Sequence, residues 1–205
     1  MFDSSVLLVF IPTFFFVSIT PGMCMTLAMT LGMSVGIRRT MWMMIGELIG
    51  VSIVATAAVI GVASLMLNYP DVFVAFKWIG GAYLVYIGVN MCRSKGKMSA
   101  SKGQQTSIKR SALFYQGFIT AIANPKGWGF MVSLLPPFIN ANYNLAPQLL
   151  VLLSIIICTE FISMMAYATG GKSLRLFLNR GDNIKWMNII AGGLMILVGI
   201  WLGFS

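Results

Sequence analysis

The sequence contains no histidine and only five acidic residues, and charged residues of both signs make up 9% of the chain. Without an imidazole, the chain cannot build a histidine zinc site, a histidine proton relay or a Ser-His nucleophile. Its carboxylates are too scattered along the sequence to form a catalytic cluster, which leaves an enzyme little to work with. We therefore expect no enzymatic activity, no bound metal and no cofactor.

Cysteine is also scarce. Cys24, Cys92 and Cys158 are odd in number and far apart, so they predict neither a disulfide framework nor a Cys-x-x-Cys metal site. We interpret them as small apolar side chains in the interior. Residues 170–173 end like a nucleotide-binding P-loop but lack the first glycine of that motif, which excludes ATP coupling within this chain.

Apolar residues are abundant: 58% of the chain is hydrophobic and the mean hydropathy is +0.87. Values this high indicate a membrane protein, because about 20 apolar residues are needed for each crossing of the hydrocarbon core. The net charge of +9 does not indicate a nucleic-acid partner, because the basic residues lie between the hydrophobic runs. We expect a single membrane domain over residues 1–205, surrounded by the lipid bilayer.

The hydrophobic runs predict an all-α membrane protein with six transmembrane helices. These cover about residues 6–33, 41–67, 72–92, 112–139, 146–169 and 184–204. Most of the 14 Lys and Arg residues fall in the first, third and fifth loops, and short basic loops stay in the cytoplasm. Both termini are therefore expected on the outer face of the membrane.

The third loop, at about residues 93–111, is rich in Ser, Lys and Gly, which is typical of a flexible cytoplasmic linker. It separates repeat one, about 1–92, from repeat two, about 112–205. Three helices in each half require the two repeats to be inverted relative to each other in the membrane. Features that recur at similar offsets are the helix breaks described next, Glu47 with Glu160, and Gly81 and Gly88 with Gly192 and Gly199.

Each half begins with a helix that a proline interrupts, at Thr20-Pro21-Gly22 and at Asn124-Pro125-Lys126-Gly127. Proline removes a backbone donor and clashes with the carbonyl one turn earlier, and in lipid the freed groups need a protein or water partner. Broken helices at matching positions of two halves indicate the binding site of a transporter. The alternative is that each proline only kinks its helix for packing.

Ionisable residues lie within the predicted spans. An acidic side chain at mid-bilayer costs about 2.5 to 3.5 kcal/mol and normally faces a cavity or a partner. Glu160 lies deep in the fifth helix and is the strongest candidate, whereas Glu47 lies closer to the inner end of the second helix, where it could snorkel. Lys126 follows the second break, and it either pairs with a glutamate, binds a substrate carboxylate or snorkels to the interface.

A zwitterionic amino acid would suit these groups. Its carboxylate would lie at a half-helix N-terminus or at Lys126, and its ammonium group at Glu160 or at unwound carbonyls. A glutamate that alternates between protonated and ionised forms would couple export to proton entry. Met23, Cys24 and Met25, beside the first break, would instead suit a soft metal ion.

These motifs resemble the LysE/RhtB superfamily of amino-acid exporters over nearly the whole chain. The resemblance extends to the sequence GAYLVYIG at residues 81–88 and to LPPFI at residues 135–139. It implies an exporter of amino acids, or of derivatives such as homoserine lactones, in a bacterial inner (plasma) membrane, with periplasmic or extracellular termini. It further implies coupling to the proton gradient and leaves both a monomer and a homodimer open.

The helix breaks, the charges within the spans and the resemblance together predict as site residues Thr20, Pro21, Gly22, Glu47, Asn124, Pro125, Lys126 and Glu160. The family's Thr-Pro-Gly-Pro-Asn motif is incomplete, because Met23 and Cys24 replace its Pro-Asn. The acidic residue of the second helix usually stands at the position of Val51, one turn after Glu47. These departures favour an apolar amino acid as substrate and leave two alternatives, a metal exporter of the cadmium type and a non-transporting accessory subunit.

Overall fold

The structure is a computed structural model that describes residues 4–93, 108–135, 138–140, 142–179 and 183–204. The described part of the chain is helical and contains no strand, which confirms the prediction of an all-α protein. Its helices are α1 (Ser4–Ile19), α2 (Met23–Ser34), α3 (Ile37–Asn68), α4 (Pro70–Arg93), α5 (Arg110–Ile122), α6 (Pro125–Leu134), α7 (Leu145–Asn179) and α8 (Asn183–Phe204).

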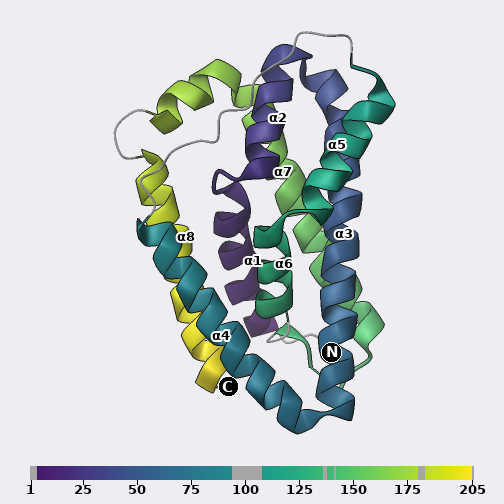
Figure 1. Ribbon diagram of the computed structural model, residues 1–205, viewed down its shortest axis with the longest axis vertical. Coiled ribbons are helices and arrows are strands. Elements are labelled where there is room, and N and C mark those ends of the chain that lie inside the picture. Colours follow the sequence, from purple (N-terminus) through teal and green to yellow (C-terminus); the bar gives the residue numbers. More distant parts are fainter. Residues whose placement is uncertain (1–3, 94–107, 136–137, 141, 180–182, 205) are drawn as a thin grey trace.

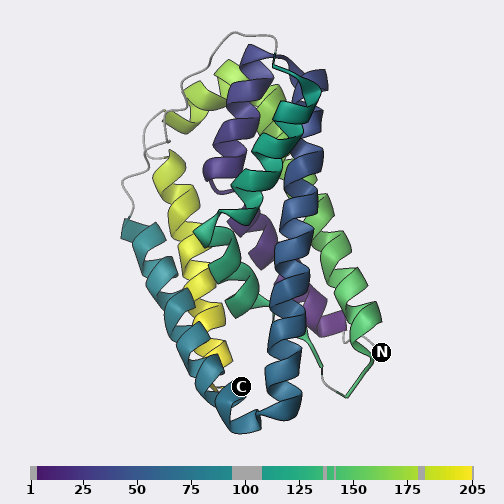
Figure 2. The same cartoon turned by 45° about the vertical axis from the view of Figure 1, so that its right-hand side comes forward.

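The chain runs back and forth along the long axis of an elongated bundle (Figure 1). α1 and α2 follow one another away from the end where the N-terminus lies, α3 returns, and α4 runs away again. The second half repeats this order in the opposite sense: α5 and α6 run toward the terminal end, α7 runs away and α8 returns. Figure 2 shows from a second side that both chain ends lie at the same end of the bundle.

Three helices are long and apolar enough to cross a membrane within the described residues, namely Ile37–Gly61 of α3, Leu145–Gly171 of α7 and Asn183–Ile200 of α8. The pair Leu7–Ile19 and Met23–Ser34 passes the same criterion as one broken span, bent by 55°. These spans make the protein a multi-pass membrane protein. The predicted total of six spans and the inverted repeat remain predictions.

The predicted fifth helix ends close to the expected position. It was expected to end near residue 169, and the apolar span of α7 is Leu145–Gly171. Gly171 adopts φ 43° and ψ −126°, a positive-φ backbone that glycine tolerates best, and this kink separates the span from a second helical segment that reaches Asn179. Lys172 and Arg175 therefore lie on a helical segment and not in a loop. The predicted third loop lies mostly outside the described residues.

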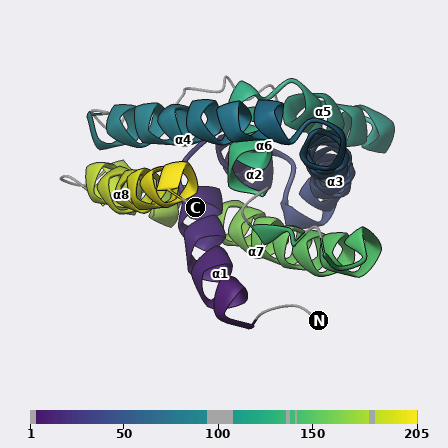
Figure 3. The ribbon, with the colours of Figure 1, turned by 90° about the horizontal axis from the view of Figure 1, so that it is seen from below.

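Two buried apolar clusters lie along the bundle. One contains aromatic residues of α1 and α6, and the rings of Phe10 and Phe138 meet edge to face at 4.8 Å between centroids. The other is rich in methionine and joins α2, α3 and α7, with Met43 and Met164 fully buried. Figure 3 shows α2 and α6 in the middle of the bundle, with α4 beside α8 and α3 beside α5 around them. The short helices that follow the two breaks are thus central elements.

Glycine allows the backbones of α4 and α8 to approach closely. A Cβ atom on Gly192 would lie 2.5 Å from the Gly88 carbonyl oxygen, and one on Gly199 would lie 2.6 Å from that of Gly81. Small residues serve the same purpose in many membrane helix pairs. The four glycines that the sequence comparison matched therefore meet one another across one interface.

Replacing Gly192 with alanine should destabilise the protein, because the new methyl group would overlap the α4 backbone. We expect a loss of about 1–3 kcal/mol in the free energy of unfolding, measured as a lower midpoint of thermal unfolding in detergent. Gly193→Ala is the matched control, since nothing lies within 4 Å of a Cβ at that neighbouring position. Equal stability of the two variants would contradict the close approach of α4 and α8.

Candidate functional site

The first helix break is held by hydrogen bonds from two sides. α1 ends at Ile19, and the Tyr167 hydroxyl on α7 donates to the Ile19 carbonyl oxygen at 2.8 Å. The Thr20 hydroxyl donates to the carbonyl of Phe16 at 2.6 Å, one turn earlier. Pro21 has no backbone N–H to continue the helix, and the Tyr167 hydroxyl provides a partner for one of the carbonyls that the end of α1 leaves open.

The second break is stabilised from within its own segment. α5 ends at Ile122, whose carbonyl oxygen accepts a hydrogen bond from the Trp128 indole Nε1 at 2.8 Å. Asn124 caps α6, and its Oδ1 accepts from the backbone N–H of Lys126 at 3.1 Å. Pro125 occupies the first turn of α6, where a missing N–H costs nothing. Both predicted breaks are therefore present in the structure.

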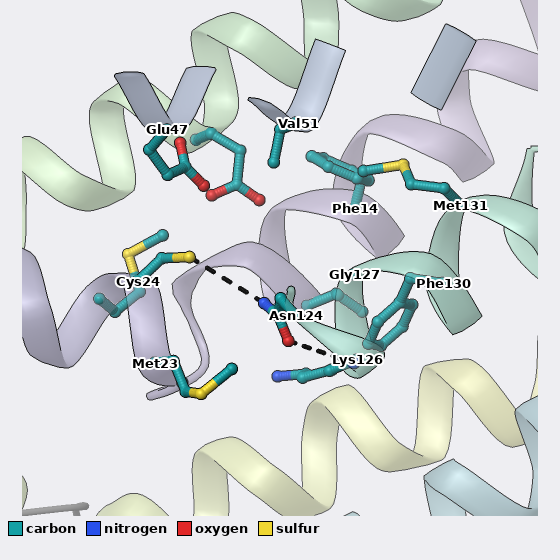
Figure 4. Close-up of a pocket in the computed structure, with 14 residues that line it drawn as sticks. Phe14, Met23, Cys24, Glu47, Val51, Asn124, Lys126, Gly127, Phe130 and Met131 are labelled. Atoms are coloured by element: carbon teal, nitrogen blue, oxygen red, sulfur yellow. Dashed lines mark hydrogen bonds between the residues drawn. The ribbon is translucent and has the colours of Figure 1, made fainter. Parts of the chain in front are cut away.

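A cavity of about 60 Å³ lies between the two breaks, with room for a few water molecules. Its lining comprises Phe14, Val17, Gly22, Met23, Cys24, Met25, Glu47, Val51, Asn124, Lys126, Gly127, Phe130, Met131 and Glu160. Figure 4 shows side chains of α2, α3 and α6 converging on this space. The polar groups come from both halves of the chain and the remaining wall is apolar.

Five of the eight predicted site residues line the cavity: Gly22, Glu47, Asn124, Lys126 and Glu160. Thr20 is 3% exposed and uses its hydroxyl within α1, so it shapes the break without lining the cavity. Pro21 also lies beside the cavity and not in its wall. The backbone of Pro125 starts α6, while its side chain is outside the described set.

The two carboxylates reach the cavity from α3 and α7. Glu47 is only 1% exposed, so it does not snorkel to the membrane surface. Among the described residues its Oε2 atom has no hydrogen-bond partner, which is costly for a buried carboxyl oxygen. Glu160 lies close enough to Glu47 and Lys126 to interact with both electrostatically.

The nitrogen groups of the cavity come from α6 and its cap. The Lys126 ammonium lies 5.6 Å above the Phe130 ring, and no described carboxylate forms an ion pair with it. It lines the cavity, so of the three alternatives for Lys126 the snorkelling one is wrong. The Nδ2 of Asn124 is 4.0 Å from the Cys24 sulfur, a hydrogen bond drawn in Figure 4. Lys126 therefore offers a positive charge to whatever enters.

Sequence reasoning missed Ser18, Trp128 and Tyr167. Each lies in an apolar helix, and its role is visible only from the group to which it is hydrogen-bonded. Two of these groups are more than a hundred residues away: Ser18 donates to Ser163, and Tyr167 donates to the Ile19 carbonyl. The sulfur donors Met23, Cys24 and Met25 do line the cavity, as the metal alternative required. However, the described residues contain no group of three His, Cys, Asp or Glu side chains placed to hold a metal ion.

Two discontinuous helices, with a charged cavity between them inside an apolar bundle, define the class of membrane transporters. Comparison with known sequences supports this class and narrows it. The model of the LysE type translocator family matches residues 15–205, and the chain belongs to this family.

Each of the following relatives aligns with most of this chain and with most of its own length. A "Homoserine/homoserine lactone efflux protein" of Salmonella typhi is 28% identical over 90% of this chain and 89% of its own. An "Uncharacterized membrane protein" of Vibrio cholerae is 28% identical over 98% of this chain and 97% of its own. The Bacillus subtilis membrane protein YrhP is 31% identical over 73% of this chain and 75% of its own. No solved structure matches the chain.

Tyr167→Phe should weaken the first break, because the Ile19 carbonyl would lose its partner in an environment without water. We expect a destabilisation of about 1–3 kcal/mol in detergent and faster hydrogen exchange around the start of α2. Tyr115→Phe is the matched control, since Tyr115 is 59% exposed on α5. If both variants unfold at the same temperature and exchange alike, the hydroxyl does not stabilise the break.

Proposed function

We propose that this translocator exports a small amino acid, or an amino-acid derivative, from a bacterial cytoplasm in exchange for protons. The observation that carries the proposal is the cavity between the two helix breaks. It combines two carboxylates, Glu47 and Glu160, with the ammonium group of Lys126, which forms no ion pair with a carboxylate in the described part of the chain. A zwitterion carries the complementary charges at a separation of a few atoms.

The substrate carboxylate would face Lys126 and the first turn of α2. Met23, Cys24 and Met25 form that turn, all three line the cavity, and Gly22 before them provides no side-chain cap. Backbone N–H groups at a helix start attract negative charge. The substrate ammonium would face the two glutamates. Among the described residues no donor reaches the Oε2 atom of Glu47, so the ammonium group would supply one.

The apolar part of the wall supports a substrate with a small, weakly polar side chain. The apolar part of the cavity wall comprises Phe14, Val17, Val51, Phe130 and Met131. A space of about 60 Å³ admits a small amino acid only if side chains such as the half-exposed Met23 move aside. The names of the Salmonella relatives, homoserine and homoserine lactone efflux proteins, agree with this size class.

Glu47 and Glu160 also give the cavity groups that bind and release protons. An inward proton contributes about 2.3 kcal/mol per 100 mV of membrane potential. Competition between a proton and the substrate ammonium for the same carboxyl pair would couple the two movements in opposite directions. This coupling gives a reason for the presence of two acidic side chains inside an apolar bundle, where each is energetically costly.

The packing supports the proposal of six spans in two inverted repeats. α3 packs against the broken helix of the second half, and α7 packs against that of the first half. The contact of Gly88 with Gly192 maps onto that of Gly199 with Gly81 when the halves are exchanged. In this arrangement the basic end of the bundle is cytoplasmic and both termini are periplasmic.

A metal ion of the cadmium type is the second candidate, because the Cys24 thiol and the Met23 and Met25 thioethers border the cavity. An amino acid ranks first because it uses Lys126 as well as the glutamates, whereas a cation would be repelled by that ammonium group.

Cells that express the chain and are preloaded with radiolabelled amino acids should lose small weakly polar substrates faster than control cells. An uncoupler should abolish the difference if protons drive export. Glu160→Gln and Glu47→Gln should each reduce efflux to the background, since a neutral amide neither binds a proton nor pairs with an ammonium. Asp71→Asn is the control, because Asp71 is exposed at the start of α4.

Efflux by the Gln variants at the wild-type rate would contradict the role of the carboxyl pair. Loss of preloaded cadmium, but of no amino acid, would favour the metal alternative. Confirmed membrane insertion without export of either would favour an accessory subunit.

Lys126→Met should distinguish substrates with and without a carboxylate. Homoserine carries a carboxylate, whereas its lactone carries the ammonium and a neutral ester, so the lysine should matter for the first only. We expect homoserine efflux to fall about tenfold or more, as for loss of a charged hydrogen bond, and lactone efflux to change less than about twofold. Lys109→Met, at the exposed start of α5, is the control. An equal loss for both substrates would remove Lys126 from carboxylate binding.

A further inference from the structure

A second cavity, of about 430 Å³, lies at the end of the bundle where α3 and α5 begin. Its lining consists of Arg38, Arg39, Met41, Trp42, Ile45 and Arg110. None of these residues borders the cavity between the helix breaks. In Figure 1 the starts of α3 and α5 lie at the end opposite to the two chain termini. This is the basic end of the molecule.

The three arginines have no negative partner in the described part of the chain. Its carboxylates are Glu47 and Glu160 in the inner cavity and Asp71 at the far end, where α4 begins. The Arg110 guanidinium lies 5.7 Å above the Trp42 ring, which holds it in place without neutralising it. Several like charges around one hollow create a strong local field, so the hollow attracts an anion.

The apolar lining indicates what kind of anion fits. Met41, Trp42 and Ile45 are each about 40% exposed, and the exposed residues Ile49, Ile53 and Ile60 continue away from them along α3. Their spacing of four or seven residues, one or two turns, places them in a single stripe that leads from the arginines toward the middle of the membrane. A free phosphate ion would contact only the arginines, whereas a phospholipid would contact the arginines with its phosphate and the apolar stripe with an acyl chain.

We propose that this cavity binds an anionic phospholipid, with the headgroup phosphate at Arg38, Arg39 and Arg110 and an acyl chain along the isoleucine stripe of α3. Guanidinium groups bind phosphate oxygens through paired hydrogen bonds. Trp42 lies where aromatic side chains normally sit, at the level of the headgroups. The bound lipid bridges α3 and α5, helices from different halves of the chain.

The test is native mass spectrometry of the purified full chain, titrated with phosphatidylglycerol or with phosphatidylcholine. We expect phosphatidylglycerol to be retained preferentially, and Arg110→Gln to weaken its binding about fivefold. Arg93→Gln is the matched control, since Arg93 is an exposed arginine in the last turn of α4 and does not line the cavity. Ile45→Gln should also weaken lipid binding, because it makes the stripe polar next to the headgroup. Thermal unfolding of each variant checks that it is folded.

A competition experiment distinguishes binding of the lipid from binding of a soluble phosphate. Glycerol 1-phosphate carries the same headgroup chemistry without acyl chains, so at millimolar concentration it should not displace phosphatidylglycerol. Displacement by it, equal retention of both lipids, or an equal loss in the Arg93 and Arg110 variants would each overturn the proposal.

Discussion

The architecture depends on how a helix can stop inside a membrane. Where a helix stops, backbone groups lose their partners, and lipid supplies none. The protein meets this requirement twice, with the Tyr167 hydroxyl on the Ile19 carbonyl and the Trp128 indole on the Ile122 carbonyl. The amide side of the first break has no side-chain cap, whereas Asn124 caps that of the second, and both helix starts border a shared space. The cavity lies where the two broken helices meet.

The charges in that space come from different helices, so the site requires the whole bundle. Glu47 belongs to α3, Glu160 to α7 and Lys126 to α6. Close backbone contact keeps one of these helices, α3, next to α5: a Cβ on Gly46 would meet the Phe114 carbonyl oxygen, and one on Gly117 would meet that of Met43. Packing by small residues at the periphery thereby sets the position of carboxylates at the centre.

Sequence patterns predicted those features of the site that have a local cause. Proline next to glycine or asparagine interrupts a helix at Pro21 and Pro125, and a carboxylate such as Glu160 in an apolar run needs a cavity or a partner wherever the run is placed. Ser18 and Tyr167 remained hidden, because a hydroxyl in an apolar helix acquires its role only when another helix approaches it. The helical segment after Gly171 was not predicted, because Lys172 and Arg175 interrupt the apolar run that marked the fifth helix.

The two breaks differ in how far along the chain their partners lie. Trp128 follows Ile122 by 6 residues, so the second break is complete almost as soon as it is made. Tyr167 lies 148 residues after Ile19, which at ribosomal rates corresponds to a delay of about ten seconds. Until Tyr167 has been synthesised, the Ile19 carbonyl lacks the hydrogen bond that it accepts in the folded structure. The stability of the first half during membrane insertion therefore depends on a residue that is synthesised much later.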